Sequence, residues 1–340
     1  MTDFIRYVSL KANIEGLPKE TDFELKETPL RKLQEGQFIA ENHFVSVDPG
    51  MRSRLSGVPG YAPPVKPGEV ISGFSIGRVL DSRSADYKKG DMVTMGGGWA
   101  SHSIFGGAGF AFKLPEIDIP RSVFLGILGV PGMTSYFGLK RIGRFQQGDH
   151  VLVTSAAGPV GATAGQLAKH WGAASVTGIA GSDEKCTWLT EKAGFDAAIN
   201  YKTESDLAGA IAVACPEGVD VLFDNVGNAM IDTVLPMMRL NGRIIVSGQT
   251  ADYSVPLEER HGIKNTIEFI AKRLLMRGLV VFDDIPNFVE AQNVMSRLIR
   301  EGILIYEEEI FEGLEALPLA FCGLFKGESF GRRLVKVGGV

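Results

Sequence analysis

The sequence has few cysteines, no long apolar run and no excess of positive charge. Its three cysteines (Cys186, Cys215 and Cys322) lie far apart, which excludes a disulfide framework and favours a reducing compartment, the cytoplasm. The longest apolar run, 123–130, is far shorter than the ~20 residues that span a bilayer. Lysine and arginine total 35 against 40 acidic residues, a net charge of −5, so we expect no nucleic-acid partner and no membrane partner.

Metal-ligand spacings are also missing. The histidines are His43, His102, His150, His170 and His261, and none forms a ligand spacing with a cysteine. Residues 67–73 contain no histidine where a zinc-dependent alcohol dehydrogenase carries a Gly-His-Glu turn. The sequence therefore predicts no metal site, and oxidation of a simple alcohol on zinc is not expected.

Glycine, in contrast, is abundant, with 42 of 340 residues, about 12% against a usual ~7%. After about residue 130, short apolar runs alternate with helical patterns, which predicts a parallel sheet covered by helices on both faces. The expected strands are 150–154, 175–179, 197–200, 219–224, 243–247 and 278–282. Six strands in ~150 residues are typical of a doubly wound dinucleotide-binding fold.

The two ends of the chain show a different pattern, with short strands separated by turns. Expected strands there are 37–45, 76–80, 92–95 and 333–337. Closely spaced short strands predict a small β-barrel or a strongly curved sheet. A length of 340 residues at ~150 per domain predicts about two domains. We expect residues 1–125 and 303–340 to form one domain, with a dinucleotide-binding domain, residues 126–302, inserted between them.

The segment 156–161, Ala-Ala-Gly-Pro-Val-Gly, follows an expected strand and opens an expected helix. Small residues at Gly158 and Gly161 let the backbone approach a pyrophosphate, and the N-terminus of the helix offers free N–H groups. Pro159 suits the first helical turn, where its missing N–H costs nothing. A merely tight turn would show the same glycines, but here strand, turn, helix and next strand all follow in register. We therefore interpret the turn as a dinucleotide site.

The end of the second expected strand selects the cofactor. An NAD site usually places an acid there to bind the ribose 2′-hydroxyl. This chain has Gly181 and Ser182 instead, with Lys185 one helical turn further on and Tyr201 after the third strand. These residues favour NADP over NAD. The alternatives are that Lys185 is a solvated helix lysine and that Asp183 caps its helix.

Four motifs carry a resemblance to a known family. They are Ser-Val-Asp-Pro-Gly-Met-Arg at 46–52, Gly-Val-Pro-Gly-Met-Thr-Ser-Tyr-Phe-Gly-Leu at 129–139, Ala-Gly-Ser-Asp-Glu-Lys-Cys at 180–186 and Phe-Asp-Asn-Val-Gly at 223–227. Nearly the whole chain resembles the zinc-independent medium-chain dehydrogenases/reductases that include prostaglandin reductase, alkenal double-bond reductase and curcumin reductase. The resemblance implies an α/β fold: a doubly wound parallel (Rossmann) sheet inserted in a smaller, GroES-like domain of β-barrel type.

The resemblance also implies NADPH as cofactor and assigns roles to single residues. It places Lys185 and Tyr201 at the 2′-phosphate and Tyr253 near the substrate carbonyl. The other implied cofactor contacts are Met133, Thr134, Gly158, Val160, Gly161, Asn225, Phe282 and Ser329. The chain departs from the family at two of its positions. Gly50 stands where the family usually has an aromatic wall of the substrate pocket, and Ser329 stands where it usually has asparagine.

The activity that the resemblance implies is reduction of the carbon–carbon double bond of an enone or enal by NADPH. Charge then builds on the carbonyl oxygen, and Tyr253 or the nicotinamide ribose hydroxyl is the expected donor to it. Tyr253 or water then protonates the α-carbon. The alternative for Tyr253 is an ordinary loop tyrosine. Tyr61 is a second candidate for the rim of the substrate pocket, with an exposed turn tyrosine as its alternative.

Two other functions share the predicted fold. The first is an NADPH quinone reductase, which also lacks zinc. The second is a non-catalytic NADPH-binding protein, which the departures at Gly50 and Ser329 would allow. We also expect a homodimer, because the run 279–282 reads as the last strand of the sheet and an open edge strand calls for a partner.

Overall fold

The computed structural model describes residues 3–58, 60, 62–106 and 110–339. The chain divides into two compact units. Unit 1 comprises Met1–Leu125, Glu308–Ser329 and Arg333–Val340, and unit 2 comprises Gly126–Glu307 and Phe330–Arg332. Unit 2 is thus inserted in unit 1.

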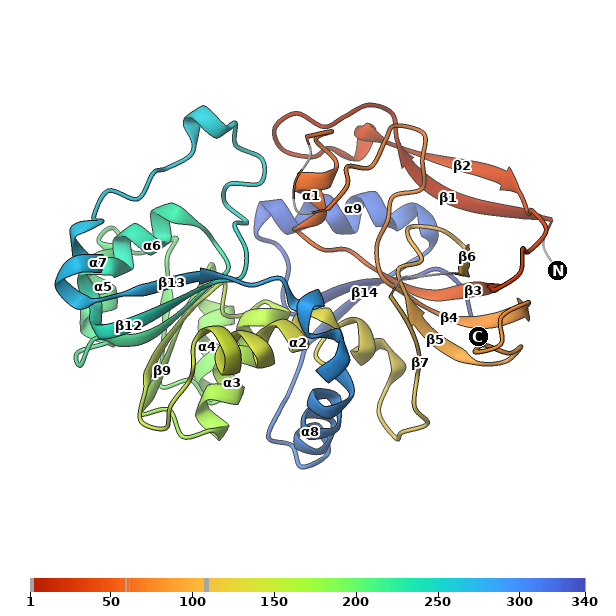
Figure 1. Ribbon diagram of the computed structural model, residues 1–340. Helices are drawn as coiled ribbons and strands as arrows, with labels where there is room; N and C mark the ends of the chain where they lie inside the picture. The colour runs from red at the N-terminus through yellow and green to blue at the C-terminus, as the bar shows by residue number, and fades with distance from the viewer. Residues whose placement is uncertain (1–2, 59, 61, 107–109, 340) are drawn as a thin grey trace. The chain divides into compact units, whose positions relative to one another are not determined.

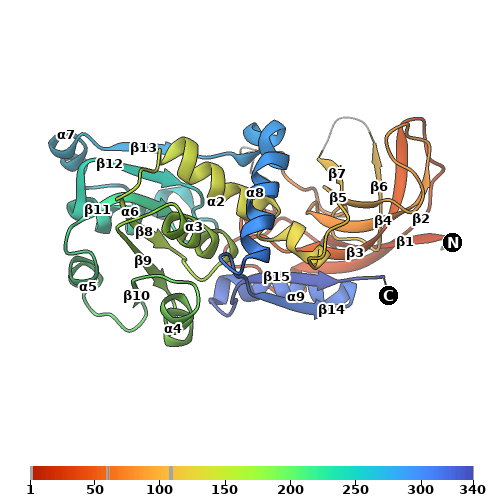
Figure 2. The same ribbon diagram turned by 90° about the horizontal axis from the view of Figure 1, so that it is seen from below.

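Unit 2 is built on a six-stranded parallel sheet. Its strands are β8 (His150–Thr154), β9 (Ser175–Ala180), β10 (Ala197–Asn200), β11 (Val219–Asp224), β12 (Met238–Val246) and β13 (Leu275–Gly278). They lie in the order β10-β9-β8-β11-β12-β13, which Figure 2 shows running from bottom to top at the left of the view. The strand order reverses between β8 and β11. Ligands of doubly wound sheets bind at this reversal, outside the carboxyl ends of the strands.

The α-helices of unit 2 surround its sheet, and α8 packs on α2 (Figure 1). They are α2 (Val130–Phe137), α3 (Pro159–His170), α4 (Asp183–Glu191), α5 (Leu207–Ala214), α6 (Asn228–Val234), α7 (Ile267–Lys272) and α8 (Phe288–Arg300). One core joins Leu152 and Leu222 of the strands to Ile211 of α5 and Ile231 of α6. Phe195 packs against both α3 and β9, because a Cβ on Gly165 or on Gly178 would collide with its ring.

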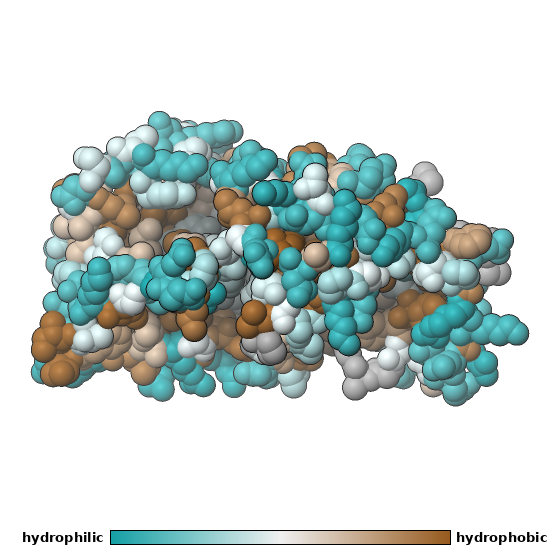
Figure 3. Space-filling view, turned by 90° about the horizontal axis from the view of Figure 1, so that it is seen from above, coloured by the Kyte–Doolittle hydropathy of each residue, from teal (hydrophilic) through white to brown (hydrophobic). Residues whose placement is uncertain are grey.

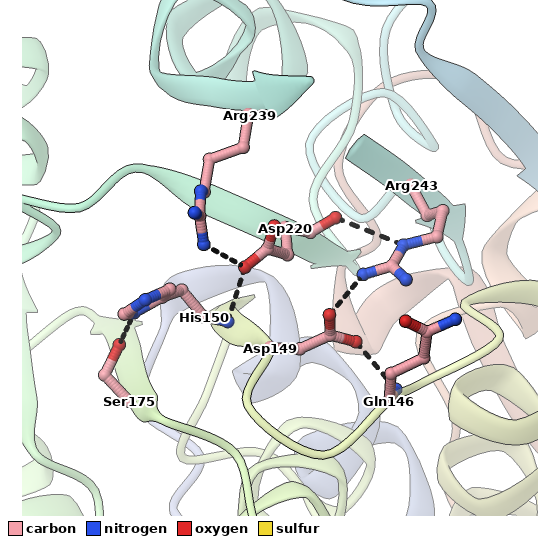
Figure 4. Close-up of polar contacts among 7 residues, drawn as sticks. All are labelled: Gln146, Asp149, His150, Ser175, Asp220, Arg239 and Arg243. Carbon is pink, nitrogen blue, oxygen red and sulfur yellow. Dashed lines mark hydrogen bonds and ion pairs between the residues drawn. The ribbon is translucent and has the colours of Figure 1, made fainter. Parts of the chain in front are cut away.

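A partly buried ion network lies at the amino ends of the strands (Figure 4). Arg243 of β12 donates to Asp149 at 2.7 Å, just before β8. Asp220 of β11 accepts from Arg239 and from the backbone N–H of His150, each at 2.9 Å. Burial raises the pKa of Asp149, and the positive charge of Arg243 opposes that rise. The network faces away from the carboxyl ends where ligands bind, so we assign it a structural role.

Unit 1 is mainly antiparallel. Its strands are β1 (Phe4–Leu10), β2 (Phe23–Pro29), β3 (Gln37–Ser46), β4 (Ser75–Ser82), β5 (Met92–Met95), β6 (His102–Gly106), β7 (Ala111–Lys113), β14 (Glu308–Glu312) and β15 (Arg332–Lys336), and its helices are α1 (Met51–Arg54) and α9 (Leu317–Cys322). The larger sheet has the order β14-β15-β3-β4-β5-β7, with β6 also paired to β3, and β1 and β2 form a hairpin. Trp99, Phe23 and Phe321 pack their rings together in the core of the unit.

The last strand of the parallel sheet does not lie where the sequence analysis placed it. The prediction was 278–282, but β13 is Leu275–Gly278 and all of its residues are exposed. The apolar residues that follow leave the sheet for a 3-10 turn, Val281–Asn287. Leu279 packs beside Gly138, where a Cβ would lie 3.3 Å from its Cδ2 atom. The apolar run 279–282 therefore reflects packing against a helix and not a strand. The edge strand β13 is only partly apolar.

The second domain boundary also differs from the expected one at 302/303. Unit 2 extends to Glu307 and takes in Phe330–Arg332. Gln166 of α3 holds the segment before Glu307 in unit 2, because its side chain binds both the N–H and the carbonyl of Ile305. The segment Phe330–Arg332 joins unit 2 because the N–H of Gly331 donates to the carbonyl of Ala157 at 3.1 Å. Among the helices of the described part of the chain, none is long and apolar enough to cross a membrane.

Candidate cofactor and active site

The glycine turn between β8 and α3 is shaped for close backbone approach. Ser155 has a positive φ of 50°, and Gly158 caps α3 in an extended conformation with Pro159 as the first helical residue. A Cβ on Gly161 would lie 2.5 Å from the carbonyl oxygen of Ser155 and 2.7 Å from Cα of Ala156, so only glycine fits. The first turn of the helix thus lies against the end of the strand, with its N–H groups at the carboxyl edge of the sheet.

The helix α2 is fixed to this turn by a contact that the sequence did not reveal. Ser135 donates its hydroxyl to the carbonyl of Val160 at 2.7 Å. Met133 is fully buried, and Thr134 donates its hydroxyl to the carbonyl of Val130 within the helix. The side chain of Met133 is therefore part of the core, and Val160 is oriented by a residue of a different helix.

The end of β9 has the features expected of an NADP site. Ser182 caps α4 by accepting from the N–H of Lys185 at 3.3 Å. A Cβ on Gly181 would lie 3.0 Å from the ring of Tyr201 and 3.3 Å from its hydroxyl, so Tyr201 lies across this glycine. Asp183, the first acid after the strand, accepts from the side chain of Asn200 at 2.7 Å. Tyr201 and the first turn of the Lys185 helix thus share one end of the sheet.

Asn225 is held rigidly at the end of β11. Its N–H donates to Thr154 Oγ1 and its side-chain amide donates to the carbonyl of Thr154, each at 2.8 Å. Thr154 in turn donates its hydroxyl to Asp224, which also accepts from the N–H of Gly227. Burial raises the pKa of Asp224 to about 6, although these hydrogen bonds lower it. Asp224 had no predicted role, although an acid at the end of an apolar strand is a signal for one.

The loop that carries Tyr253 follows β12 and is tied to Asn225. Thr250 donates both its N–H and its hydroxyl to the carbonyl of Asn225, at 3.2 and 3.1 Å. The phenolic oxygen of Tyr253 accepts from the N–H of Gln249 at 3.2 Å. The half-buried phenol therefore folds back on its own loop at the carboxyl edge of the sheet. A hydrogen bond accepted by the phenolic oxygen makes the phenol a stronger donor.

The other predicted site residues lie in several separate parts of the chain. Phe282 lies in the 3-10 turn after β13, half-exposed, and not in a strand as expected. Ser329 directly precedes the segment Phe330–Arg332 of unit 2. Gly50 caps the short helix α1 in unit 1. Tyr61 lies outside the described residues.

The described residues offer no grouping of three or more His, Cys, Asp or Glu side chains that could hold a metal ion. His150 and His261 each have local partners, the hydroxyl of Ser175 and the carboxylate of Asp232. Nδ1 of His150 and Nε2 of His261 are thus each engaged in a hydrogen bond.

A parallel dinucleotide-type sheet inserted in an antiparallel unit is the architecture of the medium-chain dehydrogenases and reductases. Two family models match the chain: an N-terminal domain of oxidoreductase over residues 6–112 and a zinc-binding dehydrogenase domain over residues 159–297. The crystal structure of CurA from Vibrio vulnificus is similar, with a TM-score of 0.92, 33% identity, and coverage of 98% of this chain and 99% of that chain. The same protein has been solved in complex with NADPH.

The sequence relatives are named enzymes of almost the same length. The chain is 39% identical to the NADP(+)-dependent 2-alkenal reductase of Nicotiana tabacum, with 98% of this chain and 97% of the relative covered. It is 37% identical to the NADPH-dependent curcumin reductase of Escherichia coli, with 95% and 94% covered. It is 38% identical to prostaglandin reductase 1 of Bos taurus, with 96% and 98% covered. The chain belongs to the medium-chain reductase family of these three enzymes, and the family assignment made from its motifs is confirmed.

Proposed function

We propose that the protein reduces the carbon–carbon double bond of α,β-unsaturated ketones or aldehydes with NADPH. The observation that carries this proposal is its identity of 37% or more, over nearly the whole chain, with relatives named 2-alkenal, curcumin and prostaglandin reductases. The geometry of unit 2 supports it, because the glycine turn, Asn225 and the Tyr253 loop all lie at the carboxyl edge of one sheet. The substrate is a small molecule.

The residues of unit 2 fit a dinucleotide with a 2′-phosphate. The backbone at Gly161 approaches Ser155 so closely that a Cβ would overlap it, so the first turn of α3 packs directly against the end of β8. The free N–H groups of that turn lie at the carboxyl edge of the sheet, where a pyrophosphate would bind. Gly181 leaves room beside Tyr201, and Asp183, the first acid after the strand, accepts a hydrogen bond from Asn200. Glycine at this position fits a phosphate better than a bare ribose hydroxyl, which would call for an acid.

In this proposal the residues take the roles that the family resemblance implies. Gly158, Val160 and Gly161 hold the pyrophosphate, while Lys185 and Tyr201 hold the 2′-phosphate. The contacts proposed near the nicotinamide and at the end of the chain are Met133, Thr134, Asn225, Phe282 and Ser329. Gly50 stays a candidate for the substrate pocket, and so does Tyr61, which lies outside the described residues. Unit 2 is the dinucleotide-binding domain, and unit 1 is the substrate domain.

When bound, NADPH supplies a hydride to the β-carbon of the substrate. As the double bond is reduced, negative charge grows on the substrate carbonyl oxygen, and a fixed donor aimed at that oxygen lowers the barrier. Tyr253 is the proposed donor, with its phenolic oxygen polarised by the N–H of Gln249. The α-carbon is then protonated by Tyr253 or by water.

The direct test is consumption of NADPH in the presence of single members of a panel of enones, enals, quinones and simple aldehydes. We expect turnover of acyclic enones or enals, with the double bond reduced and the carbonyl retained in the product. Turnover of quinones alone would favour a quinone reductase, and tight NADPH binding without any turnover would favour a non-catalytic protein.

Metal removal should not affect the enzyme. The described residues offer no cluster of ligands for a metal ion, and the reaction needs only a donor to an enolate oxygen. We expect less than a twofold change in turnover after dialysis against a chelator, and elemental analysis should show no stoichiometric zinc. A zinc-to-chain ratio near one, with activity lost on chelation, would contradict the proposal.

We further propose a homodimer formed through the edge strand β13. Leu275 and Met276 of this strand are 41% and 39% exposed, and Ile267 and Ile270 of α7 are 65% and 75% exposed. Figure 3 shows apolar side chains gathered over this end of unit 2, at the lower left of the view. An open edge strand that exposes apolar side chains is a liability unless another strand covers it. The edge strand named in the sequence analysis, 279–282, is replaced here by β13.

Light scattering at micromolar concentration should give the mass of a dimer, and Met276→Lys should shift it toward the monomer. Leu257→Lys is the matched control, because Leu257 is also exposed but lies outside β13. A monomeric wild-type protein would contradict the dimer.

A cytoplasmic location completes the proposal. Cys186, Cys215 and Cys322 are all free thiols in the structure. Free thiols are usual in a reducing compartment, and this supports the location expected from the sequence.

A further inference from the structure

Lys202 lies beside the same glycine as Tyr201, although the sequence analysis gave it no role. It follows β10 in a tight turn in which Thr203 and Glu204 donate their N–H groups to the carbonyl of Asn200. A Cβ on Gly181 would lie 3.4 Å from Cε of Lys202, on the side where it also meets Tyr201. Two successive side chains of one turn therefore flank the missing side chain of Gly181.

The charge of Lys202 is not used inside the fold. Within the part of the chain that the structure describes, no carboxylate lies within 4.0 Å of its ammonium group, and it is exposed. Lys169 of the same unit, in contrast, is paired with Asp196 at 2.8 Å. The nearby Asp183 is held by the side chain of Asn200, whose oxygen also accepts from the N–H of Lys202 at 3.2 Å. The side chain of Asn200 thus holds the turn that carries Lys202 and also binds the carboxylate of Asp183.

A phosphate monoester carries about 1.5 to 2 negative charges near neutral pH, more than one lysine neutralises. The end of β9 offers Lys185 in the first turn of α4, and the turn after β10 brings Lys202 and the phenol of Tyr201 beside Gly181. We propose that Lys202 is a second cation for the 2′-phosphate of NADPH and that it contributes to selection against NADH. This inference rests on the cofactor assignment made above.

Binding of cofactor fragments to the intact protein separates this role from catalysis. Calorimetry would compare 2′,5′-ADP with 5′-AMP for the wild type and for Lys202→Gln, which keeps most of the chain length and removes the charge. We expect Lys202→Gln to weaken 2′,5′-ADP by about five- to tenfold and to leave 5′-AMP unchanged. The dependence of 2′,5′-ADP binding on salt should also become weaker. Lys202→Arg should retain the preference.

Lys192→Gln is the matched control, because Lys192 is exposed at the far end of α4 and its loss changes the net charge equally. It should leave both affinities unchanged. Equal weakening of both fragments by Lys202→Gln, or no change in either, would overturn the role of Lys202 while the NADPH assignment stands. A wild type that binds 2′,5′-ADP no better than 5′-AMP would overturn both.

Discussion

Replacing Lys185 with alanine is expected to raise the Michaelis constant for NADPH by about 10- to 100-fold and to leave that for NADH nearly unchanged. One charge-assisted contact to a phosphate is worth roughly 1.5–3 kcal/mol, and each 1.4 kcal/mol is a factor of ten. Lys185 stands in the first turn of α4, where its backbone N–H donates to Ser182. Alanine keeps that backbone bond, so the substitution removes the ammonium group and leaves the cap in place.

Steady-state kinetics with each cofactor, at a saturating concentration of one enone, measure the effect. Lys192→Ala, at the other end of the same helix, is the control and should behave as the wild type. NADH differs from NADPH only in lacking the 2′-phosphate. The comparison of the two cofactors therefore tests the phosphate contact of Lys185 separately from the catalytic step. Equal efficiency of the wild type with NADPH and NADH would refute the prediction.

Replacing Tyr253 with phenylalanine is expected to lower the turnover number by about tenfold or more and to leave the dissociation constant for NADPH unchanged. Removal of one donor from a tight oxyanion site typically costs ~10²–10³-fold. We expect a smaller effect here, because the ribose hydroxyl of the cofactor can donate to the same oxygen. A donor used mainly in the transition state affects turnover more than binding.

The structure adds a control to this experiment. The phenolic oxygen of Tyr253 accepts from the N–H of Gln249, and phenylalanine removes this bond as well. Loss of one such hydrogen bond costs about 1 kcal/mol of folding stability, which a melting curve can detect. Turnover should therefore be measured well below the melting temperature of the variant. If the variant keeps the wild-type turnover number, and deuterated NADPH shows that hydride transfer limits the rate, Tyr253 is not part of the mechanism. Water would then protonate the α-carbon.

Most strands of unit 2 could be predicted because their signals are local. Apolar runs of four to six residues stand between a turn and a helical pattern at β8, β10 and β11, and their bounds agree with the structure. The glycine turn before α3 was equally readable, since small residues next to a strand end admit few other conformations. The sixth strand was placed wrongly, because β13 is an exposed edge and the neighbouring apolar run packs against a helix.

Contacts between distant residues could not be predicted from the sequence. Thr154 and Asn225 are separated by 71 positions, yet they form the pair of hydrogen bonds that orients the Asn225 amide. Ser135 reaches Val160 across 25 positions and joins two helices. A hydroxyl on a strand or helix has many possible partners in the sequence, and packing alone decides which of them it meets.

The amino-acid sequence by itself determined the alternation of strands and helices, the glycine turn and the absence of an acid directly after β9, because each depends on residues close together in the chain. The tertiary structure decided which side chains share an end of the sheet. Tyr201 and Lys202 lie over Gly181 only because β10 pairs with β9 in register, Asn200 beside Ala180. The Tyr253 loop reaches Asn225 because β12 pairs with β11. Register and packing thus turn residues distant in the chain into a candidate binding site.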